Sequence, residues 1–156
     1  MQRITLLTIG TPRAVWARDG VAEYTERIEH AVRFDVVSLP ASKVNDPQRQ
    51  REEESQRILD ALADRSGQIW VLDERGKQMP SLQFADAISG SRDRGEGMTF
   101  VIGGAYGLTD AVRTRADRVF ALSAMTLPHE LCQLLFVEQL YRATQIMKGS
   151  RYHHAD

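Results

Sequence analysis

Five short apolar runs alternate with helical patterns along this chain, and this alternation restricts the fold more than any other feature. Each run has about the length of a buried strand and is bounded by turn-forming residues. Apolar runs without regular alternation are typical of strands buried on both faces of a sheet. The expected strands cover residues 4–9, 34–39, 69–72, 98–102 and 119–122.

Helical periodicity separates these runs, and a fifth helical pattern follows the last one. The expected helices cover residues 16–31, 47–62, 82–88, 108–116 and 128–148. Parallel strands need crossover connections of this kind, usually helices that cover both faces of the sheet. The sequence therefore predicts an α/β fold with a mainly parallel sheet of about five strands covered by helices. A length of 156 residues fits one domain, residues 1–156.

The composition limits the classes of protein to which this chain can belong. A hydrophobic share of 42% with 26% charged residues is typical of a globular protein and not of a disordered chain. The formal net charge of −1 gives no bulk attraction to nucleic acid, so any RNA contact must be local. The single cysteine, Cys132, cannot form an internal disulfide, which favours a cytoplasmic location. We expect Cys132 to be a small buried hydrophobe and not a nucleophile.

The last expected helix, residues 128–148, is apolar on two sides. One stripe at three- and four-residue spacing consists of Cys132, Phe136, Leu140, Ala143 and Met147. Another side carries Leu131, Leu135 and Ile146. Such a helix needs two burial partners, and the sheet supplies only one. We expect the second to be the same helix of another copy, so the sequence predicts a homodimer.

Two segments at expected strand ends are candidate ligand-binding loops. Gly103, Gly104 and Gly107 form a turn in which the backbone can approach a ligand closely. Their spacing and their place after the fourth strand differ from the dinucleotide fingerprint. The second segment follows the fifth strand and consists of Leu122, Ser123, Ala124, Met125, Thr126 and Leu127. On these patterns alone, the glycine segment could equally be a plain tight turn. The segment after the fifth strand could equally be an ordinary βα loop.

Charged and aromatic residues gather near the end of the chain. Glu138 and Arg142 stand four residues apart, as in a routine helix-stabilising pair. Tyr152 and His153 follow the helix, and aromatics and arginines at such places are common in RNA contacts, although a disordered tail is the alternative. His153 and His154 are adjacent, which is poor spacing for one metal ion, so we expect no metal.

Several of these motifs together resemble the ribosomal large subunit pseudouridine methyltransferase H family. They are Leu72-Asp73, residues 101–108, residues 122–129, residues 138–143 and Tyr152-His153. The resemblance runs from end to end and includes Glu23-Tyr24-x-x-Arg27 and residues 56–59. Each motif alone is modest, but their order and spacing together are specific.

The resemblance implies both a fold and an activity. The family is the minimal form of the SPOUT superfamily, so a C-terminal trefoil knot that binds S-adenosylmethionine is implied. Its members are homodimers that methylate N3 of a pseudouridine in 23S rRNA of the assembled ribosome, without a metal and away from membranes. The implied cofactor-binding residues are Leu72, Gly103, Gly104, Leu122, Ser123, Ala124, Met125, Thr126 and Leu127.

The resemblance also implies the catalytic residues. Tyr152, His153 and Arg142 would shape the RNA pocket, with His129 or Glu138 nearby and one of the five helping to remove the N3 proton.

Two departures from the family pattern occur. Gln133 stands where relatives usually have an arginine, which removes one expected cation for RNA phosphate or the partner chain. Ala105-Tyr106 replaces a Pro-Glu type pair in the glycine turn.

Three alternative functions stay open. A SPOUT methyltransferase could act on tRNA or another rRNA position, and a non-catalytic ribosome-binding factor could keep the fold without turnover. A flavodoxin-like phosphate binder would need an anion-binding loop after the first strand, where residues 10–13 contain only one glycine.

Overall fold

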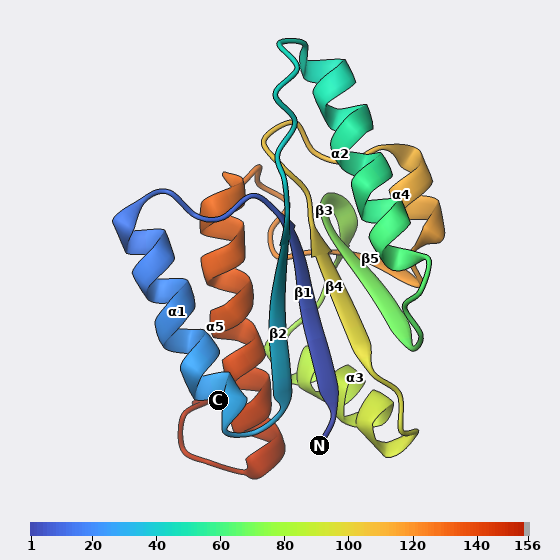
Figure 1. Ribbon diagram of the computed structural model, residues 1–156. Coiled ribbons are helices and arrows are strands. Elements are labelled where there is room, and N and C mark those ends of the chain that lie inside the picture. The colour runs from blue at the N-terminus through green and yellow to red at the C-terminus, as the bar shows by residue number, and fades with distance from the viewer. Residues whose placement is uncertain (155–156) are drawn as a thin grey trace.

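The computed structural model describes residues 1–154 and shows a five-stranded sheet with helices on both faces (Figure 1). The strands are β1 (Arg3–Ile9), β2 (Arg33–Leu39), β3 (Gln68–Gln78), β4 (Met98–Ile102) and β5 (Arg118–Ala121). The helices are α1 (Val15–Glu29), α2 (Pro47–Leu62), α3 (Ser81–Asp93), α4 (Asp110–Arg115) and α5 (His129–Lys148). All neighbouring strands are parallel, in the order β2-β1-β4-β3-β5. The predicted α/β fold is confirmed.

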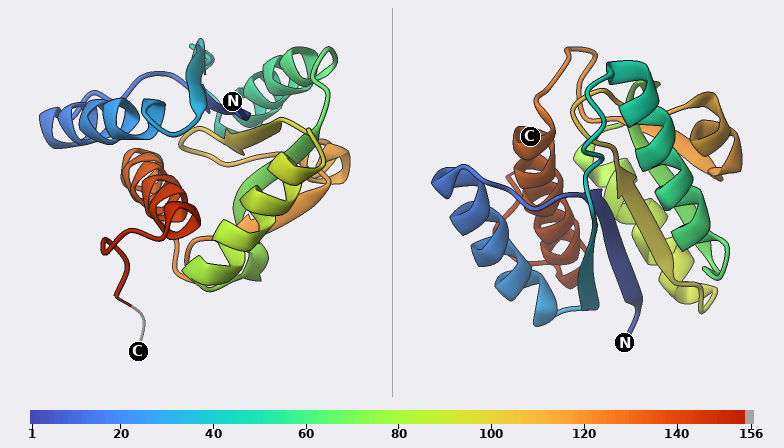
Figure 2. Two further views of the ribbon diagram at one scale, coloured as in Figure 1. Left: turned by 90° about the horizontal axis from the view of Figure 1, so that it is seen from below. Right: turned by 45° about the horizontal axis from the view of Figure 1, so that its top comes forward.

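The two faces of the sheet have different cores. Helices α1, α3 and α5 cover one face, and α2 and α4 cover the other (Figure 2). The first face is rich in aromatic rings, with Phe100 and Phe136 centroids 4.8 Å apart and Trp70 5.3 Å from Phe120. The second face is aliphatic, with buried side chains such as Leu62. Because every strand lies between two cores, the sheet is apolar on both sides, as the sequence predicts.

Strand β3 is longer than predicted. The apolar pattern ends at residue 72, whereas the strand continues through polar residues to Gln78. Its register against β5 shifts between Leu72 and Lys77, so that Lys77 pairs with Phe120. A Cβ on Gly76 would lie only 2.6 Å from the Phe120 Cα, so the two backbones approach closely there. This close approach was hidden in the sequence because residues 73–78 have no strand-like apolar pattern.

Helix α5 packs against both α1 and α3, with one stripe facing the sheet (Figure 2). Phe136, Leu140 and Ala143 of the predicted stripe are buried, and Cys132 and Met147 are partly buried beside the core. Leu131 and Ile146 on the other side are half-buried, and Leu135 is 39% exposed. Gly149 ends the helix with a φ of +74°, as predicted. The second apolar side is thus only partly covered within one chain.

Among residues 1–154, no helix combines the length and apolar character that crossing a bilayer requires.

We expect Phe136→Ala to lower the free energy of unfolding by about 3–5 kcal/mol, because a fully buried ring in the aromatic core would be replaced by a cavity. Urea denaturation followed by circular dichroism measures this loss. Leu82→Ala on α3 is the control, since Leu82 is 47% exposed, and it should cost about 1 kcal/mol or less. Equal losses in the two variants would contradict the packing described for α5.

Candidate functional site

A cavity of about 680 Å³ lies where β4 and β5 end and where β3 leaves its apolar run. Its walls come from residues 72–75 of β3, from the segments that follow β4 and β5, from the beginning of α5, and from Arg51 of α2 and Arg113 of α4. The volume is within the roughly 300–1,000 Å³ range of small-molecule sites. Eight of the nine predicted cofactor-binding residues line the cavity. The exception is Ala124, which is exposed and does not contribute to the wall.

The glycine turn (residues 103–107) forms one wall of this cavity through its backbone. Gly107 has a φ of +80°, and its N–H donates to the Gly104 carbonyl at 3.1 Å. A Cβ on Gly103 would lie 2.8 Å from the Leu108 side chain, and one on Gly104 would lie 2.5 Å from Glu54 Oε1. A side chain at 103 or 104 would therefore displace a neighbouring side chain, and the backbone conformation at 107 favours glycine. The turn lines the cavity with its backbone.

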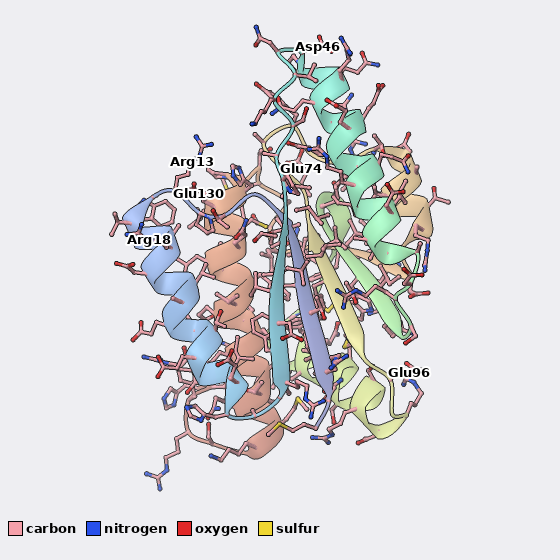
Figure 3. All side chains as sticks on the ribbon, in the orientation of Figure 1. Arg13, Arg18, Asp46, Glu74, Glu96 and Glu130 are labelled. Atoms are coloured by element: carbon pink, nitrogen blue, oxygen red, sulfur yellow. The ribbon has the colours of Figure 1, made fainter. Side chains whose placement is uncertain are left out.

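The loop at residues 122–127 forms the opposite wall and is held by hydrogen bonds. The Ser123 hydroxyl accepts from the Met125 N–H at 3.0 Å. The Thr126 hydroxyl donates to the Glu74 carboxylate, which belongs to the irregular part of β3 and is labelled in Figure 3. These contacts connect the loop after β5 with β3. The position of the loop therefore depends on the pairing of these two strands.

The beginning of α5 is anchored to the beginning of α1. Glu130 accepts hydrogen bonds from the backbone N–H groups of Arg13 and Ala14 at 2.9 and 3.3 Å, and Figure 3 shows Arg13 and Glu130 side by side. These N–H bonds hold the pKa of the Glu130 carboxyl below its usual range. His129, the preceding residue, lines the cavity. The anchor therefore sets the position of a predicted catalytic histidine.

An ion-pair network in the cavity wall was not foreseen from the sequence. Arg113 of α4 lies 2.8 Å from Asp73 and 2.5 Å from Asp110. Burial disfavours its charge, but hydrogen bonds to the two carboxylates raise the pKa of Arg113 overall. Asp73 directly follows the strand-like run, which was the only available signal. The pairing of Arg113 with Asp73 joins residues 40 positions apart, which periodicity cannot reveal.

Four of the five predicted catalytic residues form a second group, the tail cluster: Glu138, Arg142, Tyr152 and His153. Glu138 Oε1 accepts from Arg142 at 2.8 Å and from the Tyr152 hydroxyl at 3.1 Å. The Arg142 guanidinium lies 4.8 Å from the centroid of the Tyr152 ring. The Glu138–Arg142 pair is thus more than a helix-stabilising contact, because it also holds the chain that follows α5.

The same contacts determine which groups of the tail cluster can donate a hydrogen bond to a substrate. Arg142 Nη1 lies 3.2 Å from His153 Nδ1. Because a guanidinium only donates, Nδ1 accepts, and the neutral imidazole carries its proton on Nε2. Burial, followed by contacts with Tyr24 and Glu138, raises the pKa of the Tyr152 hydroxyl well above its usual value. Tyr152 is therefore a hydrogen-bond donor at neutral pH.

The predicted catalytic residues do not all meet within one chain. His129 begins α5 at the cavity, whereas Glu138 and Arg142 lie about 14 and 20 Å farther along the helix axis at 1.5 Å per residue. In Figure 1 the chain that leaves α5 does so at the opposite end of this helix from His129. The tail cluster is therefore separate from the cavity in the single chain.

Gln133 and Cys132 lie on the early turns of α5. Gln133 is 1% exposed, and its Nε2 has no hydrogen-bond partner among the described residues. Its burial within the single chain keeps the Gln133 side chain away from solvent, so the effect of the missing arginine at this position stays a prediction. Cys132 lines the cavity and packs partly buried against the core. Burial raises the pKa of its thiol to about 11.

Histidine, cysteine and carboxylate side chains do not gather into a group suited to a metal ion anywhere in residues 1–154.

The chain is similar to known proteins over nearly its whole length. The family model described as "Predicted SPOUT methyltransferase" matches residues 2–153. Proteins named ribosomal RNA large subunit methyltransferase H are similar over 97% of this chain and 99% of their own length. Those from Geobacter sp. (strain M21) and Streptococcus mutans serotype c are 38% and 39% identical, respectively.

A likeness to solved structures concerns the fold alone. A probable methyltransferase from Bordetella pertussis Tohama I aligns with a TM-score of 0.58 at 18% identity, over 92% of this chain and 95% of that chain. The α/β sheet, the cavity at its strand ends and the full-length match agree with one another. The chain belongs to the SPOUT methyltransferase family, and its relatives are the ribosomal RNA large subunit methyltransferase H proteins.

Proposed function

We propose that this protein transfers a methyl group from S-adenosylmethionine to N3 of a pseudouridine in 23S rRNA of the assembled ribosome, in the cytoplasm. The name shared by its full-length relatives supports a large-subunit rRNA substrate. The observation that carries the proposal is the cavity of about 680 Å³, whose walls are the glycine turn and the loop at residues 122–127.

The residues around the cavity fit S-adenosylmethionine. The bare backbone at Gly103 and Gly104 allows close approach of an adenine or ribose, and Leu72 and Leu122 add apolar surface. We propose that these residues, with Ser123, Met125, Thr126 and Leu127, hold the donor. Bound there, S-adenosylmethionine supplies a methyl group on a positively charged sulfur, and no metal takes part.

We also propose the trefoil knot that is typical of the SPOUT superfamily. The chain passes from β5 through the loop at residues 122–127 into α5, which packs between α1 and α3. Contacts of this loop with Glu74 of β3 support a threaded path, because they bring late residues against a much earlier segment.

We propose a homodimer with composite sites, in which the tail cluster of one protomer covers the cavity of the other. The separation between His129 and Arg142 supports this arrangement, since one chain cannot bring both to the same substrate. The incompletely covered side of α5, with Leu135 39% exposed, supports a second copy as its partner.

In such a site, each residue has a distinct role. Methylation of N3 requires that the nitrogen lose its proton as its bond to the methyl carbon forms and the carbon–sulfur bond breaks. We propose that His129 at the cavity edge accepts this proton. The Nε2–H of His153, held by Arg142, then donates to a base oxygen on which charge develops. Tyr152, which keeps its proton, positions the base beside Glu138.

Purified protein should methylate ribosomes only when S-adenosylmethionine is present, and mapping by nuclease digestion and mass spectrometry should place the mark on N3 of a pseudouridine in 23S rRNA. Free large subunits and tRNA are the comparison substrates. Methylation of tRNA in preference to ribosomes would contradict the proposed substrate. Binding of ribosomes with no transfer at all would indicate a non-catalytic factor.

Mixing two inactive variants should restore activity if the site is composite. Gly103→Val collides with Leu108 and displaces the glycine turn, and Arg142→Ala disrupts the tail cluster, so each homodimer is expected to be inactive. After random exchange of protomers, about a quarter of the sites would combine an intact cavity with an intact tail. The measurement is methyl transfer by the mixture against each variant alone. No recovery, despite heterodimers seen by native mass spectrometry, would place both parts in one chain.

Cys132 should react slowly and should be dispensable for catalysis. A thiol with a pKa of about 11 is roughly one part in a thousand thiolate at pH 8, and its thiolate fraction increases only as the pH rises toward 11. Alkylation by iodoacetamide at pH 8 should therefore be slower than that of a free thiol by about a hundredfold. Cys132→Ala should retain the methylation rate. Rapid alkylation or loss of transfer would show that the thiol is activated.

A further inference from the structure

A buried carboxylate lies directly behind the glycine turn. Glu54 of α2 is 2% exposed, and its Oε1 is so close to Gly104 that a Cβ on that glycine would lie 2.5 Å away. Its other oxygen, Oε2, accepts a hydrogen bond from the Ser42 N–H at 2.9 Å. One side chain therefore touches two loops, one after β2 and one after β4.

The partners of Glu54 are fewer than a buried carboxylate usually has. Oε1 has no hydrogen-bond partner among the described residues, and no cationic side chain within them forms a salt bridge with Glu54. Burying a carboxylate with one donor costs free energy that an apolar residue would not cost. Packing of α2 alone does not account for a glutamate at this position.

Helix α2 holds the segment after β4 at a second point. The hydroxyl of Ser55, which is 1% exposed, accepts from the Thr109 N–H at 3.1 Å. Glu54 and Ser55 thus contact the two ends of the segment from residue 104 to residue 109. The cavity wall formed by the glycine turn is supported from behind by neighbouring buried residues of one helix.

We propose that Glu54 is a positioning residue for the methyl donor: its carboxylate is held by the Ser42 N–H, fills the space behind Gly104 and so keeps the turn in its ligand-binding shape. Glu54 does not line the cavity and acts through Gly104. The reach of the side chain, more than its charge, sets the position of the turn. This inference rests on the proposed function, since it takes the glycine turn to be a wall of the S-adenosylmethionine site.

Two conservative variants separate reach from charge. Glu54→Gln keeps the length and an acceptor for the Ser42 N–H, so calorimetric affinity for S-adenosylmethionine should stay within about threefold of the wild type. Glu54→Asp keeps the charge but shortens the side chain by one methylene, so the affinity for S-adenosylmethionine should fall by about tenfold. The affinity for S-adenosylhomocysteine, which lacks the positive charge, should fall by the same factor in Glu54→Asp. The matched controls are Glu52→Gln and Glu52→Asp at an exposed position on the same helix, which should bind both ligands as the wild type does.

Hydrogen exchange provides a readout without ligand. In Glu54→Asp the amides of residues 103–107 should exchange faster than in the wild type, while those of the β1 core should not change. Unchanged exchange and unchanged affinity in Glu54→Asp would overturn the inference. So would a loss in Glu54→Gln that affects S-adenosylmethionine but not S-adenosylhomocysteine, since charge would then be the cause. Failure of the wild type to bind either ligand would instead refute the proposed donor site. The exchange result would still show whether Glu54 holds the turn at residues 103–107.

Discussion

The close approach of β3 and β5 at Gly76 is the constraint on which the site depends. There the backbone of β3 leaves no space for a side chain against Phe120, and the strand resumes pairing at Lys77 after its register shift. This pairing places the end of β5 beside the ends of β3 and β4. The loop at residues 122–127 can then face the glycine turn across one cavity. If the two strands diverged at Gly76, the walls of the cavity would separate.

Helix α5 carries the two proposed functional parts of the chain at different places along its length. Its first turn is held at the cavity by the contact of Glu130 with the beginning of α1. Its later turns present Glu138 and Arg142 to Tyr152 and His153. A straight helix of 20 residues keeps these parts apart, because its length is fixed at 1.5 Å per residue. In the proposed homodimer, a second copy of this near-neutral chain would complete the substrate pocket.

The sequence predicted some parts of the site better than others. Glycines 103, 104 and 107 do line the cavity, although their spacing alone was equally compatible with a plain tight turn. The Glu138–Arg142 spacing was visible, but its contacts with the tail were not. Arg113 and Glu54 carried no signal, since their importance comes from Asp73 and Gly104, which meet them only in the folded chain. The burial of Gln133 was also hidden, because a polar residue beside the apolar stripe of α5 gives no local sign that packing will cover it.

The sequence by itself determined the five parallel strands, the helices between them and the positions of the candidate ligand-binding loops. These features depend on local hydrophobic period and on turn residues, which neighbouring positions encode. Only the tertiary structure decided that β3 continues past its apolar run, that Glu54 lies buried behind Gly104, and that Tyr152 and His153 fold back onto Glu138 and Arg142. Those facts depend on distances between residues remote in sequence, and such distances are set by packing and not by any local pattern.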